Sequence, residues 1–213
     1  MDFLDPEIQG YAEAHTQPES DLLHRINRET HLEVLKPRML SGHLQGRLLS
    51  MFSHMMQPRM VVEVGTYTGY SALCLAEGLA PDGQLITIDV NEELDDRVRA
   101  YVQDAGLADR ISFRLGNALD ILPEIEGPLD MVFIDADKVN YGRYFDLVID
   151  KVRPGGLILA DNVLWSGKVV QPVKDNDEAT KALLAFNDMV QDDPRVENIL
   201  LPVRDGIMMA RKL

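Results

Sequence analysis

The sequence predicts an α/β protein with a doubly wound, Rossmann-like sheet of seven strands, mostly parallel and ending in an antiparallel hairpin. Two observations lead to this fold class. Short apolar runs alternate with stretches of helical periodicity, the pattern of parallel β-α-β units. Near the end of the chain, Asp205-Gly206 separates two further apolar runs, and Asp-Gly in that position indicates a hairpin. Additional helices are expected before the first strand.

The parallel part of the sheet rests on five runs, bounded by turn residues. The strands are expected at Met60–Val64, Gln84–Val90, Ile111–Leu115, Leu129–Ile134 and Leu157–Ala160. The connecting helices are expected at Tyr70–Leu79, Glu92–Ala105, Ala118–Ile125 and Tyr141–Val152. Ala80-Pro81-Asp82-Gly83 precedes the second strand and Arg153-Pro154-Gly155-Gly156 the fifth, where chain breakers belong.

The two ends of the chain complete the predicted domain. A helix over Glu178–Gln191 precedes hairpin strands at Glu197–Val203 and Ile207–Arg211, and Lys168–Asp177 is expected to be a loop. Helices are predicted at Asp21–Val34 and Ser41–Met56, with Met51, Met55 and Met56 in the core. We therefore expect one domain over 1–213, in which a helical segment (1–56) precedes an α/β core (57–213).

Composition narrows the class of function. A hydrophobic content of 46% is enough for a packed core, and a net charge of −14 argues against nucleic acid as a partner. The single cysteine, Cys74, lies in a small-residue helical stretch and is expected to be a buried, inert thiol. The acidic N-terminus does not resemble a signal peptide, and no apolar stretch is long enough for a membrane helix. We expect a soluble cytoplasmic protein with no membrane partner.

Polar residues follow two of the predicted strands directly. Asp135, Asp137 and Lys138 come after the fourth strand, and Asp161 and Asn162 come after the fifth. Ligands of open α/β sheets bind beyond the carboxyl ends of the strands, and oxygen donors suit Mg²⁺ or a similar cation. The alternative from the pattern alone is a solvated charge cluster with a local ion pair.

A glycine-containing turn follows the first strand. Gly65 and Gly69 are separated by three residues, Glu63 precedes them, and Asp89 ends the second strand. A nicotinamide-binding loop would carry G-x-G-x-x-G, whereas this wider turn suits an amino-acid-like ligand end. An acid at the position of Asp89 can accept both hydroxyls of an unmodified ribose. The two glycines alone would also fit an ordinary strand–helix turn.

Four segments carry a family resemblance. They are Glu63–Ser71, Asp135–Tyr141, Asp161-Asn162-Val163-Leu164-Trp165 and Leu201-Pro202-Val203-Arg204-Asp205-Gly206. Taken together, the chain from about Met39 to Leu213 resembles the class I S-adenosylmethionine-dependent O-methyltransferases. The resemblance is to their cation-dependent group, which includes catechol and caffeoyl-coenzyme A O-methyltransferases.

This resemblance implies a role for each matching residue. Asp135, Asp161 and Asn162 correspond to ligands of Mg²⁺, or of Mn²⁺ or Ca²⁺ in its place, and Lys138 to the catalytic lysine. Cofactor contacts are implied at Ser41, Glu63, Gly65, Thr66, Ser71, Asp89, Ala118 and Asp137. Substrate contacts are implied at Met39, Asn140, Tyr141, Trp165 and Ser166, although Tyr141 and Trp165 equally suit a role as core caps.

The implied activity is methyl transfer from S-adenosylmethionine to a hydroxyl of a small aromatic ortho-dihydroxy acceptor, by a homodimer. By analogy with the family, the helical segment 1–56 would supply lid and dimer contacts, and 57–213 would form the cofactor-binding core. Lys138 would accept the hydroxyl proton or stabilise the phenolate. The sequence departs from the plant enzymes at Ser166, at Gly42-His43-Leu44-Gln45 and in the shorter Lys168–Asp177 loop, all on the acceptor side. The alternatives are a nicotinamide-dependent oxidoreductase and a non-catalytic S-adenosylmethionine-binding protein.

Overall fold

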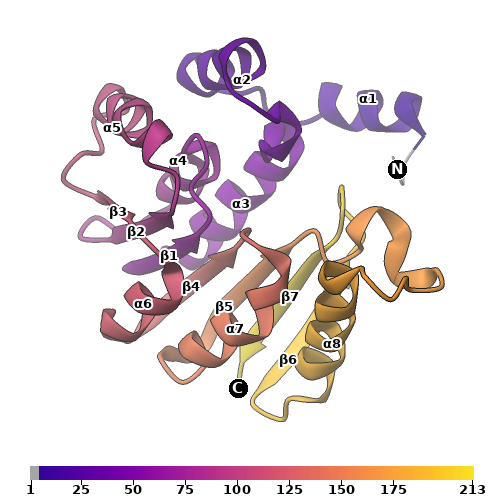
Figure 1. The fold of residues 1–213 in the computed structure, drawn as a ribbon. Helices are drawn as coiled ribbons and strands as arrows, with labels where there is room; N and C mark the ends of the chain where they lie inside the picture. The colour runs from indigo at the N-terminus through magenta and orange to yellow at the C-terminus, as the bar shows by residue number, and fades with distance from the viewer. Residues whose placement is uncertain (1–4) are drawn as a thin grey trace. The chain divides into compact units, whose positions relative to one another are not determined.

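The structure is a computed structural model that describes residues 5–213 (Figure 1). These residues separate into two compact units, Pro6–Asn117 and Ala118–Leu213, which we call the N-terminal and C-terminal units. The helical segment before the first strand therefore shares a unit with the first three strands. The predicted division at residues 56 and 57 stays a prediction. No helix among the described residues has the length and apolarity needed to cross a bilayer.

The N-terminal unit contains three parallel strands in the order β3-β2-β1. Its elements are α1 (Pro6–Ala14), α2 (Asp21–Glu33), η1 (Pro37–Met39), α3 (Gly42–Met56), β1 (Met60–Val64), α4 (Tyr70–Ala76), β2 (Gln84–Asp89), η2 (Glu92–Leu94), α5 (Asp95–Asp104) and β3 (Ile111–Leu115). In β1, Val61 and Val62 are fully buried and are paired with Leu85 and Ile86 of β2. A run of buried residues without alternation is what a parallel strand covered on both faces requires.

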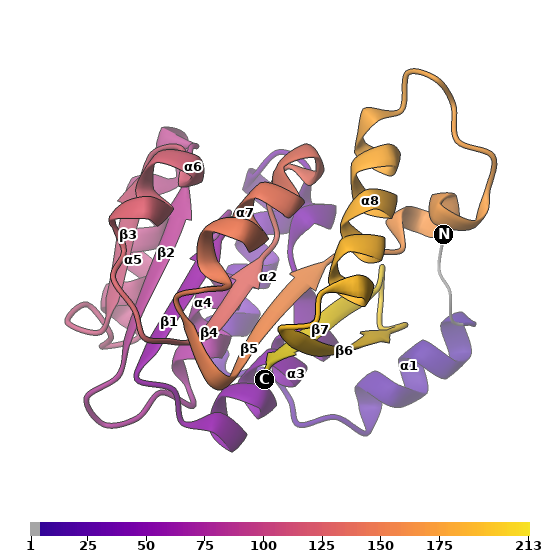
Figure 2. The same ribbon diagram turned by 90° about the horizontal axis from the view of Figure 1, so that it is seen from below.

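The C-terminal unit contains four strands in the order β4-β5-β7-β6. Its elements are α6 (Ala118–Ile121), η3 (Leu122–Glu124), β4 (Leu129–Ile134), η4 (Lys138–Asn140), α7 (Tyr141–Val148), β5 (Val152–Asp161), η5 (Trp165–Val170), α8 (Glu178–Asp192), β6 (Val196–Leu201) and β7 (Ile207–Lys212). Strands β4 and β5 are parallel, whereas β7 is antiparallel to both β5 and β6. Helices α6, α7 and α8 lie on one face of these strands (Figures 1 and 2).

The predicted fold class is confirmed. The described residues form seven strands, and the antiparallel hairpin at the end turns at Asp205-Gly206 as expected. Cys74 is fully buried as expected, and burial raises the pKa of its thiol to about 12.

Two details differ from the sequence-based expectation. The helix expected to run to Ile125 becomes a 3-10 turn at Leu122, because Pro123 cannot donate a helical hydrogen bond. Lys151 Nζ then donates to the carbonyl oxygens of Leu122, Pro123 and Ile125 at 2.6–3.0 Å. Strand β5 begins at Val152 instead of Leu157, because Val152 is already paired with Leu129 of β4; the Pro-Gly-Gly segment that follows is an irregular part of the strand, with φ of 79° at Gly155.

The expectation that the methionines of α3 are core residues was wrong for two of them. Met51 is 58% exposed and Met55 is 66% exposed. Apart from Leu49, the buried residues of α3 are small or polar ones, including Gly46, Ser50 and Ser53. Ser53 Oγ donates to the carbonyl of Leu75 in α4 at 2.5 Å, so close helix packing replaces long apolar side chains at this contact.

Candidate active site

Two carboxylates and an amide stand at the ends of neighbouring strands in the C-terminal unit. Ile134 of β4 is paired with Ala160 of β5, so Asp135 and Asp161 are the next residues of two adjacent parallel strands. Paired strands lie about 4.8 Å apart, which brings both side chains to the same edge of the sheet. Asp161 is 1% exposed, and its Oδ1 accepts the backbone N–H of Asn162 at 2.7 Å.

Lys138 lies between these strand ends. Its Nζ donates to Asp135 Oδ1 at 3.0 Å and to the Tyr141 hydroxyl at 2.6 Å. The Tyr141 hydroxyl in turn donates to the backbone carbonyl of Asp161 at 2.9 Å. A continuous hydrogen-bonded chain therefore connects the two strand ends through Lys138 and Tyr141.

Tyr141 has both a packing and a polar role in this chain. Its ring is fully buried and meets the Phe186 ring edge to face, with centroids 5.5 Å apart. Burial raises the pKa of Tyr141 well above its usual value, and the charges of Asp135 and Asp161 act in the same direction. The hydroxyl thus stays protonated and remains a donor to Asp161. The buried ring and its internal hydrogen bonds agree with the role of a core cap for Tyr141. The contact of Tyr141 with the substrate stays a prediction.

The donor set fits a hard divalent cation. Asp135 and Asp161 supply carboxylate oxygens, and Asn162 supplies an amide oxygen, which are ligands of Mg²⁺, Mn²⁺ and Ca²⁺. Asn162 has a left-handed backbone, with φ of 61°, a conformation that asparagine adopts more readily than most residues. No group of three or more His, Cys, Asp or Glu side chains in the described part of the chain is arranged as a metal site. A cation here would therefore depend on the Asn162 amide as well as the carboxylates.

The segment after Asn162 carries two predicted substrate contacts. Trp165 and Ser166 both have left-handed backbones, with φ of 48° and 54°. The ammonium groups of Lys138 and Lys168 lie 5.9 and 5.6 Å from the centroid of the Trp165 ring. The indole Nε1 is buried without a hydrogen-bond partner among the described residues, whereas Ser166 is exposed.

A turn of the C-terminal hairpin holds this segment. Asp205 Oδ1 accepts the Ser166 N–H at 2.5 Å, and the Asp205 carbonyl accepts the Leu164 N–H at 2.9 Å. Burial raises the pKa of Asp205, while the Ser166 N–H and the charge of Lys138 act in the opposite direction. The sequence predicted the turn but not this contact.

Asp137 and its neighbours form a second polar group of the C-terminal unit. Asp137 is exposed, and its two carboxylate oxygens accept from the Tyr144 hydroxyl and from Asn140 Nδ2, both at 2.5 Å. Ala118 is buried at the start of α6. Tyr144 was not among the predicted site residues. A tyrosine seven residues after an acid, across the start of a helix, is the signal that points to it.

The glycine turn has the backbone that the sequence requires. Gly65 and Gly69 have φ of 103° and 80°, in the region that disfavours other residues, and the Gly65 N–H bonds to the carbonyl of Ile88 at 2.9 Å. Ser71 is in the first turn of α4 and is buried. The turn is thus fixed against β2 at its beginning and continues into a buried helix.

The acids beside this turn are ordered by hydrogen bonds. Glu63 is fully buried and its Oε2 accepts from Thr87 Oγ1 at 2.5 Å, while Thr87 Oγ1 lies 2.5 Å from Thr66 Oγ1. Asp89 accepts the Tyr67 N–H at 2.7 Å and the Asn91 N–H at 2.9 Å. Each carboxylate oxygen of Asp89 can accept a second hydrogen bond, so a ribose hydroxyl could still bind. The structure brings Glu63, Thr66, Gly65 and Asp89 together around one turn.

The segment before β1 contacts the same turn. Thr30 Oγ1 donates to Thr68 Oγ1 at 3.2 Å, and the Tyr67 hydroxyl donates to the carbonyl of Leu35 at 3.0 Å. Of the predicted contacts in this segment, Ser41 is buried immediately before α3, and Met39 is 52% exposed.

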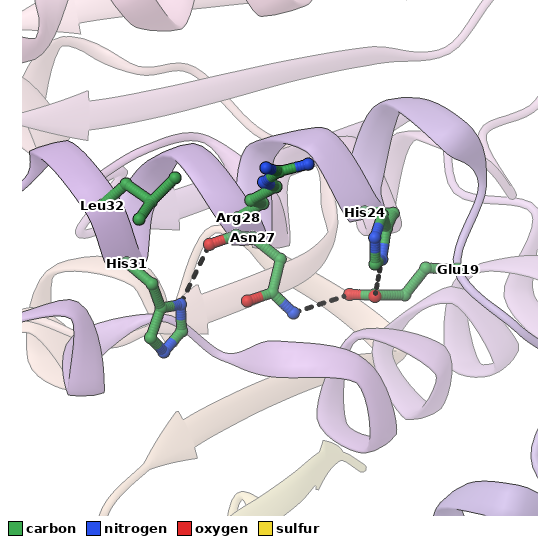
Figure 3. A pocket seen from close by; sticks show the side chains of 6 residues that line it. All are labelled: Glu19, His24, Asn27, Arg28, His31 and Leu32. Carbon is green, nitrogen blue, oxygen red and sulfur yellow. Dashed lines mark hydrogen bonds and ion pairs between the residues drawn. The ribbon is translucent and has the colours of Figure 1, made fainter.

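A groove along α2 lies outside the predicted site. Glu19, His24, Asn27, Arg28, His31 and Leu32 line it (Figure 3). Glu19 accepts from Asn27 Nδ2 at 3.1 Å and from the Tyr70 hydroxyl at 2.6 Å. Although burial raises the pKa of Glu19, hydrogen bonds from Tyr70, Asn27 and His24 outweigh it and lower the pKa overall. The contacts tie the loop before α2 to the start of α4.

Comparison with known proteins gives consistent matches over most of the chain. Residues 12–213 match the family model described as O-methyltransferase. The chain is 38% identical to caffeoyl-CoA O-methyltransferase 1 of Eucalyptus globulus, over 79% of this chain and 73% of that protein. It is 37% identical to tricin synthase 2 of Oryza sativa subsp. japonica, over 82% of this chain but only 64% of that longer protein.

A solved structure extends the likeness to the fold. The O-methyltransferase TomG of Streptomyces achromogenes, crystallised in complex with S-adenosylmethionine, is 30% identical and has a TM-score of 0.87. The match covers 97% of this chain and 96% of TomG. The strand and helix order predicted from the sequence is therefore that of known Rossmann-like methyltransferases.

Proposed function

Because the chain belongs to the O-methyltransferase family and is an S-adenosylmethionine-dependent enzyme, we propose that it methylates a vicinal dihydroxy aromatic acceptor in a reaction that requires a divalent cation. The observation that carries the proposal is the ion pair of Lys138 and Asp135 beside Asp161, at the adjoining ends of β4 and β5. The ammonium of Lys138 and the oxygen donors at these strand ends suit an acceptor with two vicinal hydroxyls, which chelate a cation and one of which loses its proton. The phenolic acceptors named for the plant relatives support the same class of substrate.

The cation is proposed to be held by Asp135, Asp161 and Asn162. When bound, it would supply Lewis-acid chemistry, drawing two vicinal oxygens together and favouring loss of a hydroxyl proton. Asp161 is preoriented for this task, because one of its oxygens is fixed by the Asn162 N–H at 2.7 Å. Burial of Asp161 also limits competition from water.

Lys138 is proposed to act on the reacting oxygen. An ammonium has three N–H donors, and two of those on Lys138 point to Asp135 and Tyr141, which leaves one for the acceptor oxygen. As the ammonium, Lys138 stabilises the phenolate by donating this third N–H, whereas only its neutral amine form would receive the hydroxyl proton. The oxygen attacks the methyl carbon in line, the O–C bond forms, and the carbon–sulfur bond breaks to give S-adenosylhomocysteine.

S-adenosylmethionine is proposed to bind through Glu63, Gly65, Thr66, Ser71 and Asp89, with further contacts at Ser41, Ala118 and Asp137. The positive-φ glycines leave room for the amino-acid end of the cofactor, and Asp89 retains capacity for ribose hydroxyls. Substrate contacts at Met39, Asn140, Tyr141, Trp165 and Ser166, the homodimer and the cytoplasmic location also remain proposals.

The first experiment tests the cation. Methylation of a panel of ortho-diphenols is measured with and without a chelator, and again after addition of Mg²⁺, Mn²⁺ or Ca²⁺. We expect the chelator to abolish methylation and a cation to restore it. Asp135→Asn should lose this response, whereas Asp146→Asn, at an exposed position of α7, should keep it. Full methylation in the presence of the chelator would refute the cation-dependent mechanism.

The second experiment tests Lys138. Lys138→Ala should lower turnover while leaving the affinity for S-adenosylmethionine unchanged, because that side chain contacts none of the proposed cofactor residues in its own unit. Lys168→Ala is the matched control, since its ammonium lies at nearly the same distance from the Trp165 ring. Equal losses in both variants would assign the effect to charge near Trp165 instead of the hydrogen bonds of Lys138.

A further inference from the structure

Asp205 connects the C-terminal hairpin to the segment that follows the proposed cation ligands. Three consecutive interactions make this connection: the carbonyl of Gly206 accepts the Val163 N–H at 3.1 Å, the carbonyl of Asp205 accepts the Leu164 N–H at 2.9 Å, and the Asp205 carboxylate accepts the Ser166 N–H at 2.5 Å. The first two interactions involve the backbone and survive any substitution of Asp205. Only the third depends on the side chain.

The segment held in this way is strained. Trp165 and Ser166 are consecutive non-glycine residues with positive φ, and Gly167 continues with φ of 77°. A left-handed backbone is unfavourable for residues other than glycine, because the Cβ atom crowds the backbone carbonyl oxygen. Such a conformation persists only when its surroundings fix it. The Ser166 N–H bond to Asp205 is the side-chain interaction that does so directly at the strained residues.

The conformation determines where the Trp165 indole lies. Its Nε1 is buried, and two ammonium groups lie over the ring, one of them that of Lys138. If the backbone of Ser166 relaxed, the ring would move relative to Lys138. We propose that Asp205 is a positioning residue that fixes Trp165 for an aromatic acceptor, a role that rests on the proposed function for its effect on catalysis.

Intrinsic fluorescence tests the positioning without any assumption about the substrate. Trp165 is the only tryptophan of the chain, so its emission and its quenching by acrylamide report on this segment alone. Asp205→Ala should shift the emission to longer wavelength and raise the quenching constant by about twofold, because a half-buried indole becomes more exposed. Asp205→Asn keeps an oxygen that can accept the Ser166 N–H and should behave like the wild type. Glu197→Ala, at the other end of the hairpin, is the control.

Kinetics on the methylated acceptor test the consequence. Asp205→Ala should raise the KM for the acceptor by about tenfold, the effect of losing one charge-assisted hydrogen bond, with the KM for S-adenosylmethionine unchanged. Asp205→Asn should keep the KM for the acceptor close to the wild-type value. A general loss of folding would instead lower kcat and the melting temperature in every assay.

The outcomes separate the two proposals. Unchanged fluorescence in Asp205→Ala, or equal changes in Asp205→Ala and Asp205→Asn, overturns the positioning role. A fluorescence change without any effect on the acceptor KM overturns its link to the acceptor. If the wild type methylates none of the ortho-diphenols, the proposed function fails, while the fluorescence result still decides whether Asp205 positions Trp165.

Discussion

Replacing Tyr141 by phenylalanine removes one oxygen from the centre of the hydrogen-bonded chain. That hydroxyl accepts from Lys138 Nζ at 2.6 Å and donates to the carbonyl of Asp161 at 2.9 Å. The ring keeps its shape, so its edge-to-face contact with Phe186 is retained. The change therefore isolates the two hydrogen bonds from packing.

The expected loss in stability follows from these two interactions. A hydrogen bond to a charged group contributes about 1.5–3 kcal/mol and a neutral one about 1 kcal/mol. Both partners are largely buried, since Lys138 is 9% exposed and Asp161 1% exposed, so solvent cannot replace the hydroxyl fully. Tyr141→Phe should lower the free energy of unfolding by about 2–4 kcal/mol, measured by urea denaturation. It should also lower kcat by about 10–100-fold, because Lys138 loses a positioning contact.

Tyr101→Phe is the matched control. Its hydroxyl likewise accepts from a cation, Arg97 at 3.2 Å, and donates to an acid, Glu29 at 2.5 Å. Those partners are about one-third exposed, so the stability loss should be smaller, and kcat should not change. Equal stability losses in the two variants, or an unaltered kcat in Tyr141→Phe, would refute the reasoning that the chain through Tyr141 orders Lys138.

Three other predictions concern stability. Burial raises the pKa of the Cys74 thiol from 9.0 to about 12, so its contribution to stability is complete below pH 9 and is lost as the pH rises toward 12. Between pH 8 and 11, the free energy of unfolding from urea titrations should fall by about 3 kcal/mol more in the wild type than in Cys74→Ala. Parallel plots of unfolding free energy against pH for the two proteins would contradict this. Gly206→Ala places a Cβ 2.4 Å from Leu164 Cγ at φ of 85°, and should lower the melting temperature far more than Gly10→Ala, whose Cβ meets nothing. Lys168 lowers the pKa of Asp177, so Asp177→Asn should be less stable than the wild type at pH 7. The difference should vanish as the pH falls below 3.8 through the lowered pKa of Asp177. A difference that persists in acid would assign the effect to the hydrogen bond that Asp177 accepts from the Thr180 N–H at the start of α8.

The sequence predicted the strands best where apolar runs end abruptly. Met60–Val64, Ile111–Leu115 and Leu129–Ile134 are strands with the expected bounds. Strands β1 and β4 are buried along almost their whole length, whereas the edge strand β3 alternates between buried and more exposed residues. The segment before Leu157 was predicted as a chain break ahead of the strand, yet it lies inside β5. Pairing of Val152 with Leu129 starts the strand earlier, and the proline and glycines form a bulge before pairing resumes at Leu157.

The candidate site was predictable only in part, for a related reason. Asp135 and Asp161 could be placed together because parallel strands end at the same edge of a sheet. The hydrogen bonds of Tyr141 to Lys138 and Asp161 depend on side-chain rotamers, and the contact of Asp205 with Ser166 joins residues 39 apart in the chain. Periodicity and spacing carry no information about either. The exposed positions of Met51 and Met55 were missed because helical spacing alone does not show which face is covered.

Three contacts join the segment of residues 19–35 to the glycine turn and the start of α4. The conformation of the turn therefore depends on a part of the chain that precedes it by dozens of residues. Glu19, Thr30 and Leu35 each bond to a residue between 67 and 70. If the turn binds S-adenosylmethionine as proposed, mutations that change cofactor affinity are to be sought within residues 19–35 as well as in the turn itself. In directed evolution, a library confined to the glycine motif would miss the neighbouring positions that set its shape from outside.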